Sequence, residues 1–241
     1  MTSVSAANSS SLSAAAITKQ KKKNVDPEIV TVQAIYRVSK RCSGGADGGV
    51  VGTNGSIRPT CLVRMLRAMG ISGSEFLDFG AGVGLVLFAA MAGGATKAIG
   101  YELPDNKAHK FVFDAVLKKL HMENRFALPV SWSEGQWYPR DIDDMRRMPG
   151  NPHCVYSFWV GMPFKTQEHI LRLCARCPTV RAIAVFRDRK WPKPDDVVTA
   201  LEELTTRGRR GEGWVLSERV PTAMYCSGEQ HVAWIFSRQF D

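Results

Sequence analysis

No stretch of the 241-residue sequence approaches the ~18 consecutive apolar residues that a membrane-spanning helix needs. No signal peptide precedes the six cysteines, which show no regular framework, so we expect reduced thiols in an intracellular protein. The pair Cys174 and Cys177 lacks the second C-x-x-C that would complete a zinc site, and the histidines stand singly. We therefore predict no metal site.

Acidic residues are also scarce relative to basic ones, which leaves a formal net charge of +9. Such a charge favours a polyanionic partner, such as nucleic acid or a complex that contains it, although solubility alone is the alternative explanation. The length and a hydrophobic content of 44% suit one α/β domain with one sizeable core and a tail.

Residues 1–24 are mostly Ser, Ala and Thr, and they bury too little apolar surface to offset the entropy of ordering. We predict that this segment is a disordered tail. It ends in a cluster of basic side chains: Lys19, Lys21, Lys22 and Lys23. The cluster suits a nuclear address or a contact to DNA phosphates, with a solvated tail as the alternative. Because no acid precedes Asp26, a cleavable organelle presequence also stays open, although arginine is missing too.

The remaining residues, 25–241, are predicted to form one α/β domain in two parts. Residues 25–75 carry a helix that starts behind Asp26-Pro27, a glycine-rich loop near 42–55, and a second helix that ends at Gly70. The loop and the second helix stand immediately before the first strand of the second part, where a lid could be carried. Residues 76–241 form the predicted core.

Within this core, short apolar runs alternate with helical patterns. Strands are predicted at 76–79, 98–101, 126–130, 154–158, 182–186, 214–217 and 231–236. The alternation favours a parallel sheet with helices on both faces. The connection between the last two strands is too short for a crossover helix, so they pair as a hairpin. The predicted fold is a seven-stranded, mostly parallel α/β sheet with an antiparallel C-terminal hairpin at its edge.

The first strand of the core runs into a glycine-rich turn. Asp78 lies two positions before Gly80, which opens the pattern Gly80-x-Gly82-x-Gly84. Only glycine lets a backbone turn there and approach a ligand closely. Glu102 ends the next strand, near the ~20-residue offset of an acid that binds a ribose. The pattern indicates a nucleoside-cofactor site.

The spacing of the glycines narrows the cofactor. The dinucleotide fingerprint requires Gly-x-Gly-x-x-Gly, and here the third glycine falls one place early. No Gly-Lys-Ser/Thr follows, which excludes a phosphate loop. The motif resembles instead the first motif of the Rossmann-like, S-adenosylmethionine-dependent methyltransferases. A nicotinamide enzyme and a glycine turn in an unrelated α/β domain are the alternatives.

Further segments extend the resemblance. They are GSIRP at 55–59, LV-x-ML at 62–66, FLDFGAGVG at 76–84, GYE at 100–102 and YCSGEQHV at 225–232. Together they resemble the disruptor-of-telomeric-silencing family of histone-lysine methyltransferases. The resemblance implies a Rossmann-like core without the SET architecture, S-adenosylmethionine as cofactor, a nucleosomal lysine as acceptor, basic segments that bind DNA, and a nuclear location.

The same resemblance assigns roles to individual residues. Asp78, Gly80 and Gly82 would line the methionine end of the cofactor, and Glu102 would bind the ribose hydroxyls. Leu85 stands where the family usually has a polar glutamine.

The sequence also departs from the family after its third and fourth strands. The acid that would address adenine is replaced by Ser131, which could hydrogen-bond, and by Trp132, which could stack. The segment 158–164 stands where the family has Asn-Asn-Phe, and it contains no asparagine. Trp159 and Phe164 could form an apolar channel there, since aromatic faces attract a substrate ammonium by ~0.5–2 kcal/mol. The alternative is that both rings only cover the sheet edge.

The sequence thus predicts a methyltransferase, with a histone lysine as its acceptor. Two rival hypotheses remain. The first is a methyltransferase that acts on another protein, RNA or a small molecule. The second is a scaffold with this fold that does not catalyse.

Overall fold

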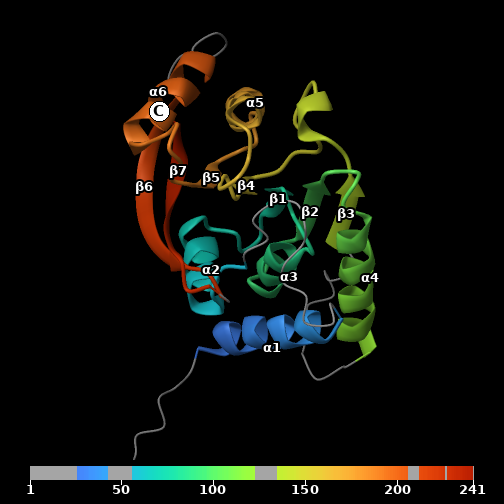
Figure 1. Ribbon diagram of the computed structural model, residues 1–241. Helices are drawn as coiled ribbons and strands as arrows, with labels where there is room; N and C mark the ends of the chain where they lie inside the picture. Colours follow the sequence, from blue (N-terminus) through green and yellow to red (C-terminus); the bar gives the residue numbers. More distant parts are fainter. Residues whose placement is uncertain (1–25, 43–55, 123–134, 206–211, 226, 241) are drawn as a thin grey trace, which may run out of the picture.

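A computed structural model of the protein describes residues 26–42, 56–122, 135–205, 212–225 and 227–240 (Figure 1). These residues form a seven-stranded sheet with helices on both faces. Its strands are β1 (Glu75–Phe79), β2 (Lys97–Glu102), β3 (Gly135–Pro139), β4 (Cys154–Ser157), β5 (Ala182–Phe186), β6 (Glu212–Ala223) and β7 (Gln230–Phe240).

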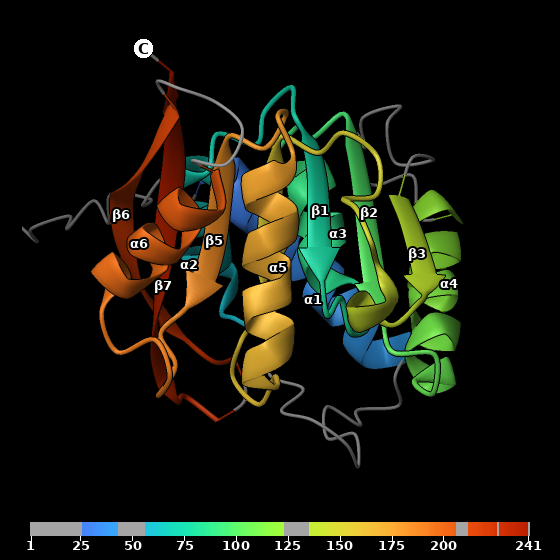
Figure 2. The same ribbon diagram turned by 90° about the horizontal axis from the view of Figure 1, so that it is seen from above.

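The strands lie in the order β3-β2-β1-β4-β5-β7-β6 (Figure 2). The first five are parallel, and β7 runs antiparallel to both β5 and β6. The chain turns back at β1, which pairs with β2 on one side and β4 on the other. In open α/β sheets, ligands bind at the carboxyl ends of the strands beside such a switch point. The predicted fold, including the C-terminal hairpin, is confirmed.

Helices cover both faces of the sheet. They are α1 (Pro27–Cys42), α2 (Pro59–Ala68), α3 (Leu85–Ala92), α4 (Lys107–Met122), η2 (Ile142–Asp144), α5 (Phe164–Arg176) and α6 (Pro194–Thr205). Helices α1, α2 and α3 lie on one face, with α4 towards the β3 edge, while α5 and α6 lie on the other face (Figures 1 and 2). Of the helices among the described residues, none is long and apolar enough to cross a membrane.

The central strands are buried on both sides, so their apolar side chains divide between two cores. Phe76 packs with α1, α2 and α3, while Leu77 and Phe79 pack with α5 and α6. Because side chains alternate along a strand, Asp78 points to the same face as Phe76. The face that carries α1–α3 therefore also holds the acid that the sequence singled out.

The hairpin forms one edge of the sheet and also contacts the C-terminal end of α5. Arg238 of β7 is buried, and its guanidinium stacks over Trp214 of β6 at 4.7 Å. It donates hydrogen bonds to the carbonyls of Cys174, Ala175 and Cys177 at 3.1, 2.8 and 2.9 Å. These carbonyls lie at the C-terminal end of α5, which is the negative end of the helix dipole, so a buried cation there stabilises the helix.

The third strand was not predicted where it lies. The prediction for 126–130 falls outside the described residues, and the strand that pairs with β2 is Gly135–Pro139. Its sequence, Gly-Gln-Trp-Tyr-Pro, has a weak strand pattern. The edge position explains why Pro139 is tolerated, because an edge strand does not need every backbone donor.

Helix α4 turns Phe113, rather than Phe111, towards the core. The side chain of Phe111 is 73% exposed. Phe113 is buried and stacks on Phe88 of α3 at 5.0 Å. The helix lies against α1 and β3 at the side of the sheet, and its position there determines which ring is buried.

Candidate cofactor site

The glycine turn lies at the carboxyl end of β1. Gly80, Gly82 and Gly84 have φ values of +87°, +52° and +80°, a left-handed region that suits glycine. The backbone N–H groups of Gly80 and Ala81 both donate to the carbonyl of Tyr101, at 2.9 and 3.0 Å. These bonds hold the turn against the end of β2.

Glu102 is thereby brought to the turn, as the sequence predicted. Its side chain is buried, and one carboxylate oxygen accepts from the N–H of Gly82 at 2.6 Å. The other oxygen accepts from the N–H of Leu103 at 2.9 Å and from the amide of Asn106 at 2.8 Å. Three donors orient the carboxylate, and its two oxygens offer about four acceptor positions.

Asp78 lies beside Glu102 and is 1% exposed. Among the described residues, neither of its carboxyl oxygens has a hydrogen-bond partner. Burial raises the pKa of Asp78 well above its ordinary value, and the nearby Glu102 carboxylate adds to the rise. Tyr156 pairs with Asp78 in the sheet register, and burial and Asp78 raise the pKa of its hydroxyl as well. An unpaired carboxyl group in this position suits a cation that is not part of the chain.

The turn is closely packed below and open above. A side-chain carbon added at Gly100 of β2 would lie 2.6 Å from the Ala81 side chain and 2.7 Å from Leu87, so β2 needs a glycine there. A carbon added at Gly82 meets no atom within 4 Å. At Gly80 the nearest atom is the methyl group of Met162, at 3.6 Å. Among the described residues, the space above Gly82 is left for a ligand.

Trp137 of β3 also supports the turn, and the sequence analysis missed it. Its indole N–H donates to the carbonyl of Gly82 at 2.8 Å, and its ring is buried. No periodic pattern marks this residue, because β3 is short and its pairing with β2 brings the tryptophan to the site. Together, Trp137 and Glu102 hold both backbone polar groups of Gly82.

Leu85 is the first residue of α3 and is 8% exposed. Its side chain packs in the core beneath α1–α3, so the contact that it can offer a cofactor is apolar. Ser131, Trp132 and the lysines of the tail lie outside the described residues, as does most of the glycine-rich loop. Among the described residues, no three His, Cys, Asp or Glu side chains gather as metal ligands.

The channel predicted at Trp159 and Phe164 is not formed by Trp159. The Trp159 ring is fully buried in the core beneath α5 and α6, 5.9 Å from Trp191. Phe164 is 38% exposed and also packs on Trp191, at 5.4 Å. Neighbouring side chains at a strand end point to opposite faces, so Trp159 turns away from the face that holds Asp78.

Phe158, the residue before Trp159, lies on the opposite face of the sheet from it. It packs against the α1–α3 core, 4.7 Å from Phe186 and 5.6 Å from His231. These three rings come from the ends of β4 and β5 and the start of β7. They lie on the same face as Asp78, at the carboxyl edge.

The order of strands, the glycine turn and the C-terminal hairpin define the fold of the class I methyltransferases. Magnesium protoporphyrin IX methyltransferase of Synechocystis PCC 6803, crystallised with bound SAM, is similar with a TM-score of 0.53 and 14% identity. The match covers 90% of this chain and 99% of that one.

Two further structures agree. A protein of Pyrococcus horikoshii that is suggested to be an RNA methyltransferase matches with a TM-score of 0.51 and 14% identity, over 89% of this chain and 97% of that one. Precorrin-6y C5,15-methyltransferase of Geobacter metallireducens GS-15 matches with a TM-score of 0.50 and 15% identity, over 80% and 93%. No protein-family model and no curated protein matches the sequence. The likenesses establish the fold, and the histone-lysine family remains a prediction.

Proposed function

We propose that the protein is an S-adenosylmethionine-dependent methyltransferase. This proposal rests on three groups that lie together at the carboxyl ends of the strands. Gly82 lies under open space, the Glu102 carboxylate is bonded to its N–H, and the unpaired Asp78 carboxyl is buried beside them. The SAM bound in the magnesium protoporphyrin IX methyltransferase structure agrees with it.

The residues present fit this cofactor. Its ammonium group would be the cation that the Asp78 carboxyl lacks, and ionising Asp78 beside a cation would bring its pKa down again. Glu102 keeps acceptor capacity for a ribose hydroxyl besides its three donors. When bound, S-adenosylmethionine supplies a methyl group on a sulfonium, which a nucleophile can attack without further activation of the methyl.

The protein's own part is then binding and alignment. The turn would hold the cofactor at the carboxyl end of β1, and Glu102 and Trp137 keep Gly82 in place. Holding the acceptor atom in line with the reacting carbon removes the entropy of bringing the two together.

The acceptor predicted by the resemblance is a histone lysine in chromatin. The observation in its favour is the group of rings Phe158, Phe186 and His231, since aromatic faces attract an ammonium. The missing asparagine weighs against it. RNA, another protein or a small molecule is the alternative acceptor, and two neighbours with different substrates, a porphyrin and a precorrin, share the same fold.

Calorimetric titration with S-adenosylmethionine and with its demethylated product tests the cofactor assignment. We expect both to bind the native chain, and Glu102→Ala or Asp78→Ala to weaken binding by at least 100-fold. Asp105→Ala is the matched control, because Asp105 is an exposed acid on the same edge. Unchanged affinity in Glu102→Ala would show that the ribose site is misassigned.

Transfer of a labelled methyl group to nucleosomes, free histones and total RNA tests the acceptor. Label on nucleosomes alone would support the histone-lysine hypothesis, whereas label on RNA would support the alternative. Cofactor binding without transfer to any of them would favour a scaffold that does not catalyse.

A further inference from the structure

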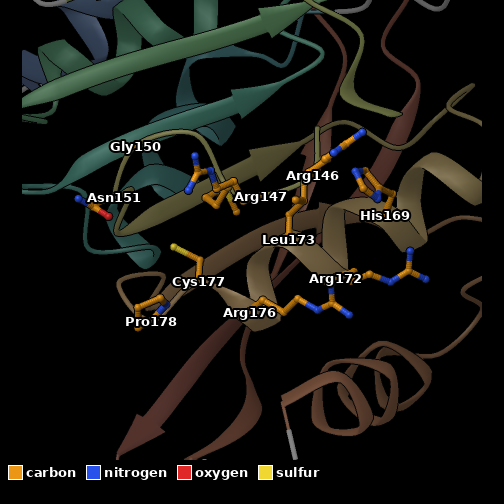
Figure 3. A pocket seen from close by; sticks show the side chains of 11 residues that line it. Arg146, Arg147, Gly150, Asn151, His169, Arg172, Leu173, Arg176, Cys177 and Pro178 are labelled. Atoms are coloured by element: carbon orange, nitrogen blue, oxygen red, sulfur yellow. The ribbon is translucent and has the colours of Figure 1, made fainter. Parts of the chain in front are cut away.

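Two adjoining cavities lie along the segment 140–151, which joins β3 to β4. The first lies between this segment and α5, and the second is lined by the segment alone. Their volumes are about 220 and 450 Å³, and they share the lining residues Arg146, Arg147, Met148 and Gly150. Figure 3 shows the first cavity, with Arg146 and Arg147 from the segment and Arg172 and Arg176 from α5. Arg140 lines the second. We call the surface formed by these five arginines the arginine groove.

The positive charge of the arginine groove is largely uncompensated. All five arginines are exposed, and within the part of the chain that the structure describes none forms an ion pair. One acid, Asp144, lines the second cavity. Five like charges around a hollow repel one another, and the repulsion is relieved when an anion with several charges binds. The net charge of the protein is therefore concentrated in part at a concave surface.

The arginine groove begins at the carboxyl ends of the strands, where the candidate cofactor site lies. The N–H of Arg140 donates to the backbone carbonyl of Glu102 at 2.8 Å. The segment then runs to the amino ends of the strands, where the N–H of His153 donates to the carbonyl of Glu75 at the start of β1. Arg172 and Arg176 are four residues apart on α5, which places them ~6 Å apart along the helix axis. The groove thus offers a row of cations that leads to the candidate site.

An exposed aromatic ring stands at the same end. Tyr138 of β3 is 42% exposed and stacks on Tyr101 of β2, with 5.5 Å between ring centroids. It lies two residues before Arg140. An aromatic ring beside a row of cations is the arrangement with which proteins bind single-stranded nucleic acids, because bases stack on the ring while cations contact the phosphates.

We propose that the arginine groove binds the backbone of single-stranded RNA and brings one nucleotide to the carboxyl edge as the methyl acceptor. The second half of this statement rests on the proposed function. A cavity of a few hundred Å³ admits a single strand, whereas a duplex is too wide to enter it. A lysine-rich histone tail would be repelled by five arginines, so the groove favours a polyanion.

Asp144 favours RNA over DNA. A carboxylate among arginines repels phosphate, but it accepts a hydrogen bond from a hydroxyl group. The ribose 2′-hydroxyl is such a donor, and DNA lacks it. We therefore expect Asp144→Ala to reduce the preference for RNA over DNA of the same sequence.

Fluorescence anisotropy of the full chain with a labelled single strand of about 20 nucleotides, over a series of salt concentrations, tests the proposal. We expect Arg146→Glu/Arg147→Glu and Arg172→Glu/Arg176→Glu each to lower RNA affinity by at least tenfold. Each lost phosphate contact should lower the slope of log K against log salt by ~0.7. The matched control is Arg37→Glu/Arg219→Glu, which reverses two exposed arginines on α1 and β6.

Thermal melts show whether the variants fold, and Arg172→Gln/Arg176→Gln should give a smaller loss of affinity than the reversal. Affinity that falls equally in the groove variants and the control, or in none of them, would overturn the proposal. Equal binding of RNA and DNA by the native chain would overturn the assignment to RNA.

Calorimetry with S-adenosylmethionine on the same groove variants separates the two proposals. We expect unchanged cofactor affinity in these variants. If the native chain binds RNA through the groove but no cofactor, the proposed function fails while RNA binding by the groove stands. If it binds the cofactor and the groove variants bind RNA as well as the native chain does, the inference fails and the proposed function stands.

Discussion

Asp78 carries the strongest electrostatic conflict at the candidate site. Its carboxyl group is fully buried without a hydrogen-bond partner among the described residues, and Glu102 is a second carboxylate nearby. The pKa of Asp78 is therefore higher in the folded protein than in the unfolded chain. The folded state binds this proton more tightly, so ionising Asp78 destabilises it.

The pH dependence of stability follows from this sign. As the pH rises above the ordinary pKa of an aspartate, the unfolded chain loses the proton first, and stability falls until the folded pKa is passed. Each unit of difference between the two pKa values costs about 1.4 kcal/mol at high pH. We expect Asp78→Asn to remove this loss, because an amide does not ionise.

Urea unfolding of the native chain and Asp78→Asn, between about pH 4 and pH 9, measures this difference. The variant should gain stability relative to the native chain as the pH rises. Parallel pH profiles for the two proteins would contradict the raised pKa. Asp105→Asn, at an exposed site, provides the control.

The glycine turn and β2 act as one packed element. Gly100 of β2 has no room for a side chain, because Ala81 of the turn and Leu87 of α3 lie where its Cβ would be. In a filled core the neighbours must shift to admit one more methyl group, at a cost of about 1–3 kcal/mol. We expect Gly100→Ala to lower the free energy of unfolding by this amount and to weaken cofactor binding by displacing Ala81 and the turn.

Gly213→Ala is the matched control for this substitution. Gly213 also lies in a strand with ordinary φ, and a carbon added there meets no described atom within 4 Å. Denaturant unfolding of both variants measures the difference. A loss as small in Gly100→Ala as in Gly213→Ala would show that the turn does not pack on β2 as described.

Elements with a strong local pattern could be predicted, and those defined by their neighbours could not. The strand over 76–79 and the glycines after it follow from apolar residues and from backbone demands that glycine meets. In contrast, β3 is a strand because β2 offers it a free edge, and the buried stripe of α4 depends on what the helix packs against. Trp137 reached the site through that pairing and left no signal in the sequence.

At the scale of the whole molecule, cofactor binding should stabilise the fold. A ligand that binds only the folded state at 100 times its Kd adds about 2.7 kcal/mol to the free energy of unfolding. For a domain of this size, that corresponds to a rise in Tm of about 5–10 °C. Thermal melts with increasing S-adenosylmethionine measure it, and Glu102→Ala should show no rise. A Tm that stays constant in the native chain at every concentration would contradict the cofactor assignment.

The sequence by itself determined the class of fold and the place of the candidate cofactor site. Periodic apolar runs specify strands and helices locally. The glycines of a tight turn and an acid at the end of a strand can each be recognised from single residues. Asp78, Gly82 and Glu102 could therefore be named before their contacts were seen.

Only the tertiary structure decided which side chains surround the candidate cofactor site. A side chain at the end of a strand faces one side of the sheet or the other according to its register, and that placed Phe158, rather than Trp159, on the same face as Asp78. The five arginines of the groove come from a connecting segment and a helix that are distant in the chain. Their nearness results from the packing of this segment against α5 on one face of the sheet, which no local pattern encodes.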